Sequence, residues 1–213
     1  MLYSESKNFV FVHVWKTAGE SIVDALRPYT QFPFNNRVAT KILRLMPTGA
    51  AKSMGWRAHL VHGQHLQGAD IRDVMPPGLF ERAYSFGFVR NPWDWTVSAY
   101  HYAQQTPANP EHKKALTFKT LNEYVTYRED VHPRQQSSFL FEGDTQIVSK
   151  VGKFENLQED FAEILDNLGI EGELPKRNVS SRSRDWRKYY DDETYDKVAK
   201  LYARDIKLLG YEP

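Results

Sequence analysis

The sequence predicts an α/β fold in which helices flank a central, mainly parallel sheet. The first observation is a pair of continuous apolar runs, residues 9–14 and 84–89, both rich in Val and Phe. Runs without alternating polar residues are typical of parallel strands that are buried on both faces. The second observation is that a helix signal follows each run directly. Alternating strands and helices predict a three-layer domain that binds ligands at the carboxyl ends of its strands.

The first apolar run leads into a turn, residues 15–21, with the sequence WKTAGES. The residues from Ile22 to Leu26 then predict a helix that ends before Pro28. A helix start presents N–H groups and a partial positive charge. Lys16 adds a full charge, and Thr17 and Ser21 add hydroxyl groups. This composition is typical of an anion-binding loop; the alternative is a plain strand–helix corner with an exposed lysine.

The second apolar run ends at Arg90, whose guanidinium can bind a phosphate through two hydrogen bonds. The next residues predict a helix start, with Asn91 as N-cap, Pro92 at the first helical position and Asp94 in the first turn. Ser98 lies about two turns into this helix. Two anion sites at strand ends predict a ligand with two separate anionic groups.

Residues 13–21 (HVWKTAGES) resemble the 5′-phosphosulfate loop of sulfotransferases, and residues 88–94 (FVRNPWD) with 98–101 (SAYH) resemble their 3′-phosphate motif. The similarity is closest to carbohydrate-type (Golgi-type) sulfotransferases and their bacterial relatives. Residues 151–157 and the tail from 189 to 211 also resemble that family. The chain departs from the usual family residues at Trp15, Glu20 and Trp95.

This resemblance implies a P-loop-like fold in a single domain, residues 1–213. It implies 3′-phosphoadenosine 5′-phosphosulfate (PAPS) as the donor and 3′-phosphoadenosine 5′-phosphate (PAP) as the product. The donor-binding residues that it implies are Lys16, Thr17, Ala18, Gly19, Glu20, Ser21, Arg90 and Ser98.

A basic cluster in the tail, between residues 176 and 188, is a further candidate for donor binding. In the resembling family a C-terminal loop closes over the 3′-phosphate or the adenine, and Arg182 and Arg184 are the residues that we assign to this role. The alternatives are a solvated basic surface and a site for an acidic polysaccharide acceptor.

Sulfuryl transfer resembles phosphoryl transfer, because it depends on positioning and on stabilising charge at the peripheral oxygens. Lys16 suits the bridging oxygen of the leaving phosphate. His is the residue type best suited to deprotonate an acceptor hydroxyl near neutral pH. We expect His65 to be this base, with His62 as the alternative and Glu20 and His101 next in order.

The predicted function is therefore that of an enzyme, a PAPS-dependent sulfotransferase that transfers the sulfuryl group in line to a hydroxyl of a carbohydrate or glycolipid. The first alternative is a P-loop-type nucleotide-dependent kinase. It is disfavoured because no glycine of a Gly-x-x-x-x-Gly-Lys-[Ser/Thr] motif precedes Lys16. The second alternative is a module that only binds a nucleotide or glycan, and transfer assays separate it from an enzyme.

The composition predicts which partners, metal sites and membrane segments the protein lacks. A net charge of +1 gives no overall field that would attract the chain to nucleic acid or acidic membranes, so partners must be inferred from local sites. We expect no nucleic acid as a partner. The lack of Cys excludes disulfides and thiolate metal sites. We expect no metal. No apolar run approaches the ~20 residues of a membrane span, and no signal peptide is recognisable, so we expect a soluble, cytoplasmic protein.

The remaining segments predict a short strand within 147–154 and several helices. The helices are expected at 38–45, 118–125, 156–168 and 192–209. Residues 47–58, 103–116 and 171–187 are expected to be irregular.

Overall fold

A computed structural model describes residues 1–131, 134–175, 183 and 185–212 of the chain. Its contacts divide the chain into two compact units. Unit 1 comprises Met1–Val89 with Ser138–Arg177, and unit 2 comprises Arg90–Ser137 with Asn178–Pro213. The single domain expected over residues 1–213 stays a prediction.

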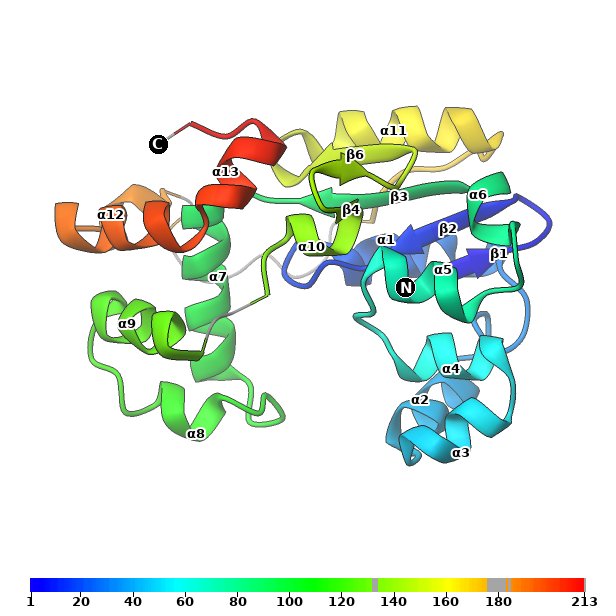
Figure 1. The fold of residues 1–213 in the computed structure, drawn as a ribbon, viewed down its shortest axis with the longest axis horizontal. Helices are drawn as coiled ribbons and strands as arrows, with labels where there is room; N and C mark the ends of the chain where they lie inside the picture. Colours follow the sequence, from blue (N-terminus) through cyan, green and yellow to red (C-terminus); the bar gives the residue numbers. More distant parts are fainter. Residues whose placement is uncertain (132–133, 176–182, 184, 213) are drawn as a thin grey trace. The chain divides into compact units, whose positions relative to one another are not determined.

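Unit 1 is built on a four-stranded sheet, which is labelled in Figure 1. The strands lie in the order β1 (Leu2–Ser4), β2 (Phe9–Val12), β3 (Tyr84–Val89) and β6 (Lys150–Lys153). The β2–β3 and β3–β6 pairs are parallel, and only the edge strand β1 is antiparallel. The sheet is therefore mixed but mostly parallel, which confirms the predicted α/β class.

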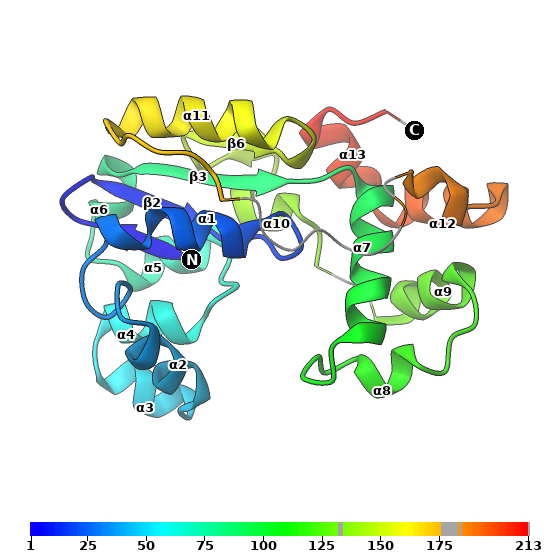
Figure 2. The same cartoon turned by 180° about the vertical axis from the view of Figure 1, so that it is seen from behind.

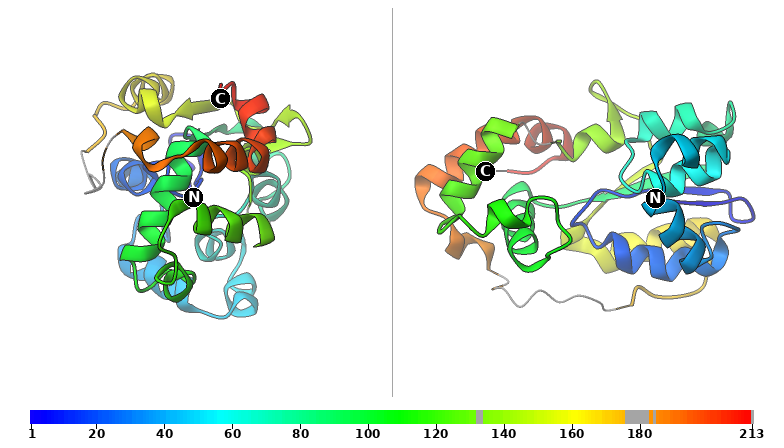
Figure 3. Two further views of the ribbon diagram at one scale, coloured as in Figure 1. Left: turned by 90° about the vertical axis from the view of Figure 1, so that its left-hand side faces the viewer. Right: turned by 90° about the horizontal axis from the view of Figure 1, so that it is seen from below.

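The register of the sheet brings the ends of β2 and β3 to the same edge, because Val12 pairs with Gly87. All four residues of β2 are fully buried. This burial explains why its sequence is continuously apolar, since helices cover both faces of the sheet. Figure 2 shows α1 and α11 on one face, and Figures 1 and 3 show α5 on the opposite face.

The helices of unit 1 are short and mostly lie between β2 and β3. They are α1 (Gly19–Leu26), η1 (Arg27–Tyr29), α2 (Arg37–Leu45), α3 (Thr48–Ser53), α4 (Trp56–His62), α5 (Gly68–Val74), α6 (Leu79–Arg82), α10 (Ser137–Leu140), η2 (Phe154–Asn156) and α11 (Leu157–Leu168). A two-stranded hairpin, β4 (Phe141–Glu142) and β5 (Thr145–Gln146), precedes β6. Helix α10 begins one residue before the boundary of unit 1.

The expectation that residues 47–58 are irregular was wrong, because α3 and α4 occupy most of this segment. A contact from outside the segment holds these helices. His62, at the end of α4, bonds through its ring nitrogens to the Leu43 carbonyl on α2 (3.0 Å) and to the Thr48 hydroxyl on α3 (3.1 Å). One side chain therefore ties three helices together.

Unit 2 is helical, and α8, α9 and α12 pack against the long helix α7. Its elements are α7 (Pro92–Gln105), α8 (His112–Ala115), α9 (Leu121–Val131), η3 (Trp186–Tyr189), α12 (Asp192–Leu201) and α13 (Ala203–Leu209). The buried Trp93 stacks against Trp186 and Tyr195, with ring centroids 6.2 and 4.7 Å apart. Trp95, one of the departures from family residues, is also fully buried and meets Tyr202 edge-on.

The single helix expected over residues 192–209 is interrupted at Tyr202, whose φ of −112° and ψ of 26° are not helical. The interruption changes the face that the last turns bury. Asp205 is completely buried and Ile206 only partly, because the Asp205 carboxylate accepts the N–H groups of Gln136 and Ser137, both at 2.7 Å.

None of the helices in the described part of the chain combines the length and the apolar character that a membrane crossing requires.

Candidate functional site

The loop between β2 and α1, residues 13–18, has an unusual backbone. Lys16 and Ala18 both have a φ of 64°, in the left-handed region that non-glycine residues rarely adopt. Such strain persists where the surrounding structure enforces it, and it concentrates at functional sites. Left-handed residues that alternate with ordinary ones turn successive N–H groups toward one side, which forms an anion-binding concavity. The loop therefore has the backbone geometry of an anion cradle.

The start of α1 reinforces this cradle. Its N-cap residue is Ala18, which has no polar side chain to accept hydrogen bonds from the first turn. The buried Thr17 hydroxyl donates to the Val14 carbonyl at 2.8 Å, so its proton serves the fold of the loop. Ser21 is also buried, whereas Glu20 is exposed and Lys16 is partly exposed. Backbone N–H groups and the Lys16 ammonium are thus the donors best suited to an anion here.

Gly19, the first residue of α1, leaves room for the imidazole of His13. A Cβ atom on Gly19 would lie 1.8 Å from Nε2 of His13, so no other residue fits without moving this ring. His13 follows β2 directly and stacks on Phe11, with ring centroids 5.6 Å apart. Burial, reinforced by nearby positive charge, holds the pKa of His13 well below its usual range. A neutral, buried imidazole therefore packs directly against the first residue of α1.

His65 lies beside the base of this loop. It occupies a turn in which the Leu66 N–H donates to the Gly63 carbonyl at 3.0 Å. Its Nδ1 is 3.0 Å from the His13 carbonyl oxygen, and the two imidazole centroids are 4.5 Å apart. Because a carbonyl only accepts hydrogen bonds, Nδ1 carries the proton when the ring is neutral. The lone pair then resides on Nε2, which is the tautomer that a general base at that atom requires.

His62 is placed differently, because both of its ring nitrogens contribute to the helix contacts described above. This arrangement favours His65 over His62, although the assignment of the base stays a prediction. His101 lies in unit 2, where it meets the ring of Tyr189 edge-on at 5.1 Å.

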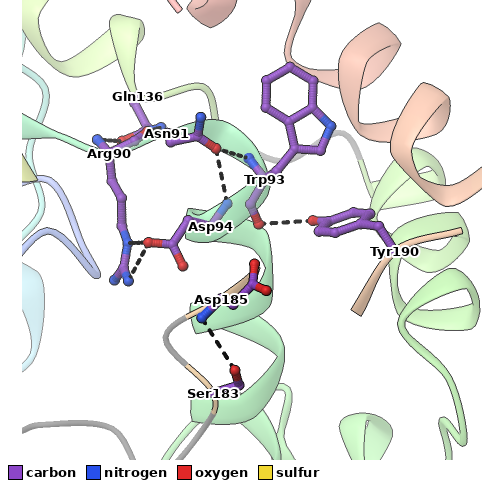
Figure 4. Close-up of polar contacts among 8 residues, drawn as sticks. All are labelled: Arg90, Asn91, Trp93, Asp94, Gln136, Ser183, Asp185 and Tyr190. Carbon is purple, nitrogen blue, oxygen red and sulfur yellow. Dashed lines mark hydrogen bonds and ion pairs between the residues drawn. The ribbon is translucent and has the colours of Figure 1, made fainter. Parts of the chain in front are cut away.

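Arg90 begins unit 2, and Figure 4 shows its side chain beside the first turn of α7. Its Nε and Nη2 atoms both lie 2.7 Å from one carboxylate oxygen of Asp94. Arg90 is only 7% exposed, so this ion pair is largely shielded from water. The pair fixes the plane of the guanidinium, which is the precondition for directional binding of a phosphate.

Gln136 holds the backbone of Arg90 from the other side (Figure 4). Its Oε1 accepts the Arg90 N–H at 2.8 Å, and its Nε2 donates to the Arg90 carbonyl at 2.7 Å. Asp205 in turn fixes Gln136 by accepting its backbone N–H. Gln136 and Asp205 are both fully buried, and a buried network whose hydrogen bonds are satisfied is rigid. These contacts therefore hold the backbone of Arg90 in a fixed position.

The predicted start of α7 is confirmed. The Asn91 side chain accepts the N–H groups of Trp93 (3.1 Å) and Asp94 (3.2 Å), and Pro92 occupies the first helical position. The Tyr190 hydroxyl donates to the Trp93 carbonyl at 2.8 Å, as Figure 4 shows. Ser98 lies inside α7 and is buried. Because Asn91 already accepts the first N–H groups, the start of α7 is capped by the protein itself, and anion binding by Arg90 stays a prediction.

Arg182 and Arg184, predicted to contact the donor, lie outside the described residues. Between them, the Ser183 hydroxyl accepts the Asp185 N–H at 3.2 Å (Figure 4), and the Ser183 N–H donates to the Tyr189 hydroxyl at 3.1 Å. No cluster of three or more His, Asp or Glu side chains suited to a metal ion is found in the described part of the chain.

Sequence reasoning missed three contributors to these sites: the close contact between Gly19 and His13, and the roles of Gln136 and Asp205. The contact between Gly19 and His13 could have been suspected from the sequence, because Gly19 is the one glycine in a turn that also contains a lysine and two hydroxyl residues. Nothing in the sequence around Gln136 pointed to Arg90, because the two residues are 46 positions apart.

Comparisons with known proteins identify a family and a relative. The model of the sulfotransferase family matches residues 1–212. An uncharacterised protein of Archaeoglobus fulgidus is 26% identical over 120 residues, which cover 55% of this chain and 94% of that protein. No solved structure matches the chain significantly.

Proposed function

This chain belongs to the sulfotransferase family, and on that premise we propose that it transfers the sulfuryl group of PAPS to a hydroxyl group of a carbohydrate or glycolipid. The observation that carries the proposal is the loop before α1. Its two left-handed residues, its uncapped helix start and Lys16 together form a cradle for an anion directly after a buried strand. We also propose that the sheet belongs to the P-loop-like class.

In the proposed reaction, the acceptor oxygen forms a bond to sulfur while the bond between sulfur and the bridging phosphate oxygen breaks. Negative charge develops on that bridging oxygen, and PAP leaves with the electron pair. Lys16 is the group that we assign to this charge, and the N–H groups of the loop and of the α1 start stabilise the peripheral oxygens. Because the strained loop is already formed, little reorganisation accompanies the reaction.

His65 accepts the proton of the acceptor hydroxyl in this proposal. Support comes from the contact between its Nδ1 and the His13 carbonyl, which places the basic lone pair on Nε2. The same contact fixes the ring beside the base of the loop. A positioned base typically accelerates a reaction ~10²–10⁴-fold.

Arg90 and Ser98 are the residues that we propose for the 3′-phosphate of the donor. Support comes from the fixed plane of the Arg90 guanidinium and from the clamp that Gln136 forms on its backbone. A preformed arginine binds a phosphate without ordering a long side chain at the moment of binding.

Thermal shifts with three nucleotides test the donor class. PAP should stabilise the protein by roughly 2.7 kcal/mol at ~100 times its dissociation constant, and 5′-AMP at equal concentration should stabilise it much less. Equal shifts with PAP and 5′-AMP, or a larger shift with ATP and Mg²⁺, would contradict the proposal.

A transfer assay tests the reaction itself. PAPS labelled in its sulfuryl group should pass the label to one or more members of a panel of oligosaccharides and glycolipids. The matched control is Lys16→Ala, which should bind PAP but transfer little. If PAP binds and no hydroxyl acceptor becomes labelled, the chain is a binding module and the proposed transfer is wrong.

A further inference from the structure

Residues 25–69, which we name the basic segment, contain no acidic residue at all. The chain has 27 Asp and Glu residues and a net charge of only +1, so a stretch of this length without any of them is a marked local bias. The basic residues of the segment are Arg27, Arg37, Lys41, Arg44, Lys52 and Arg57. Arg37 and Arg57 pair with Asp24 and Glu5 from outside the segment, whereas Lys41 and Lys52 are exposed and form no ion pair among the described residues.

The same segment exposes large aliphatic side chains. Val38, Ile42 and Leu45 on α2 are 69, 55 and 79% exposed, and Met54 beyond α3 is 61% exposed. The three α2 residues are spaced i, i+4, i+7, so they form one stripe along the helix. Lys41 and Arg44 precede Ile42 and Leu45 by one residue, so a basic stripe runs beside the apolar one.

Unit 1 holds α2 with this stripe turned outward. The opposite side of the helix is fixed, because Thr40 and Leu43 are buried and the Asn36 side chain caps the first turn through the Ala39 N–H. His62 binds the Leu43 carbonyl and the Thr48 hydroxyl, which fixes α2 relative to α3 and α4. The stripe cannot turn inward unless these contacts break, so its exposure is built into the fold of unit 1.

We propose that the basic segment is a docking surface for a lipid bilayer rich in anionic headgroups. An apolar stripe beside lysine and arginine side chains is the pattern of a helix that lies in the membrane interface. The aliphatic side chains would enter the acyl boundary, and the basic side chains would contact the phosphates. An acidic polysaccharide would account for the charges but not for four exposed aliphatic side chains. The proposal does not depend on sulfuryl transfer.

Sedimentation with lipid vesicles tests this surface on the full chain. We expect clear binding to vesicles of equal parts phosphatidylcholine and phosphatidylglycerol, and weak binding to phosphatidylcholine alone. The double variant Lys41→Gln/Lys52→Gln should lower the partition coefficient roughly 30-fold, at about fivefold per charge. The double variant Ile42→Ser/Leu45→Ser should lower it roughly 10-fold, because less apolar surface enters the bilayer.

Matched controls come from unit 2, where Lys113, Lys119 and Leu116 are also exposed. Lys113→Gln/Lys119→Gln and Leu116→Ser should bind vesicles like the unmodified chain. The proposal is overturned if no binding to anionic vesicles is seen, or if the control variants lose as much binding as the test variants. Dissociation of an oligomer by Ile42→Ser/Leu45→Ser would also overturn it, because the stripe would then be a contact between copies of the chain. Binding of heparin, with loss of vesicle binding in the charge variants alone, would overturn it in favour of an acidic polysaccharide.

Discussion

The loop of residues 13–18 with the start of α1, and the segment from Arg90 to Ser98, both follow a buried parallel strand. Their helix N–H groups are satisfied differently. Helix α1 begins after Ala18, which offers no side-chain acceptor, and the preceding backbone is held in left-handed conformations. Helix α7 begins after Asn91, whose side chain accepts two of the first N–H groups. The first helix start therefore has no side-chain cap, whereas Asn91 caps the second.

This difference indicates what each segment would contribute to the proposed donor binding. The loop presents backbone N–H donors and one lysine. Replacement of its small side chains should therefore change donor affinity mainly where it alters the backbone conformation. The segment at Arg90 relies on a side chain that Asp94 and Gln136 hold in place. Removal of any member of that network should therefore weaken the proposed binding of the 3′-phosphate by Arg90.

The largest effect is expected for His65→Ala, which should lower turnover ~10²–10⁴-fold and leave PAP binding unchanged. The matched control is His62→Ala. It loses two structural hydrogen bonds, at about 1 kcal/mol each, so it should unfold at a lower temperature and keep its turnover number. If His62→Ala is the inactive variant and His65→Ala is active, the two roles are reversed.

Gly19→Ala should destabilise the protein by about 1–3 kcal/mol, because the new methyl group overlaps the His13 ring. The clash disappears when His13 is also replaced. Gly19→Ala should therefore have little further effect on the free energy of unfolding in a His13→Ala background, as measured by denaturant titration. Additive losses in the double variant would show that Gly19 is required for another reason.

Gln136→Leu should lower stability by about 1–3 kcal/mol, since the N–H and the carbonyl of Arg90 lose a buried partner. It should also weaken PAP binding roughly tenfold and leave 5′-AMP binding unchanged, because Arg90 loses its position. Gln135→Leu, which removes the bond of the neighbouring amide to the Leu201 carbonyl, is the control that keeps the preference for PAP. If the two variants show the same nucleotide preference, the assigned positioning role of Gln136 is wrong.

The smallest effect is expected for Ala18→Gly, because glycine adopts a φ of 64° without the strain that alanine carries. Stability should rise by up to about 1 kcal/mol, and PAP affinity should stay within twofold. Ala18→Val, with a branched side chain at the same position, should instead lower both. A loss of PAP affinity in Ala18→Gly would mean that the Ala18 methyl group itself contacts the donor.

The sequence predicted those features that are encoded within a few residues. The apolar runs predicted β2 and β3, and the Asn91-Pro92 pair predicted the start of α7. The stripe on α2 predicted a helix but not that its apolar face is exposed, because spacing carries no information on what covers a face. Contacts between distant residues, such as His65 with His13 or Gln136 with Arg90, depend on tertiary packing and could not be predicted.

The central claim is that Arg90 reads the 3′-phosphate through its side chain, whereas the loop reads the 5′ group through its backbone. The most direct test is calorimetric titration of PAP and 5′-AMP into the unmodified chain, Arg90→Ala and Thr17→Val. We predict that Arg90→Ala removes about 1.5–3 kcal/mol of PAP binding and none of 5′-AMP binding, so that the preference for PAP disappears. Thr17→Val should keep that preference. Equal losses for both nucleotides in Arg90→Ala, or a lost preference in Thr17→Val, would contradict the account.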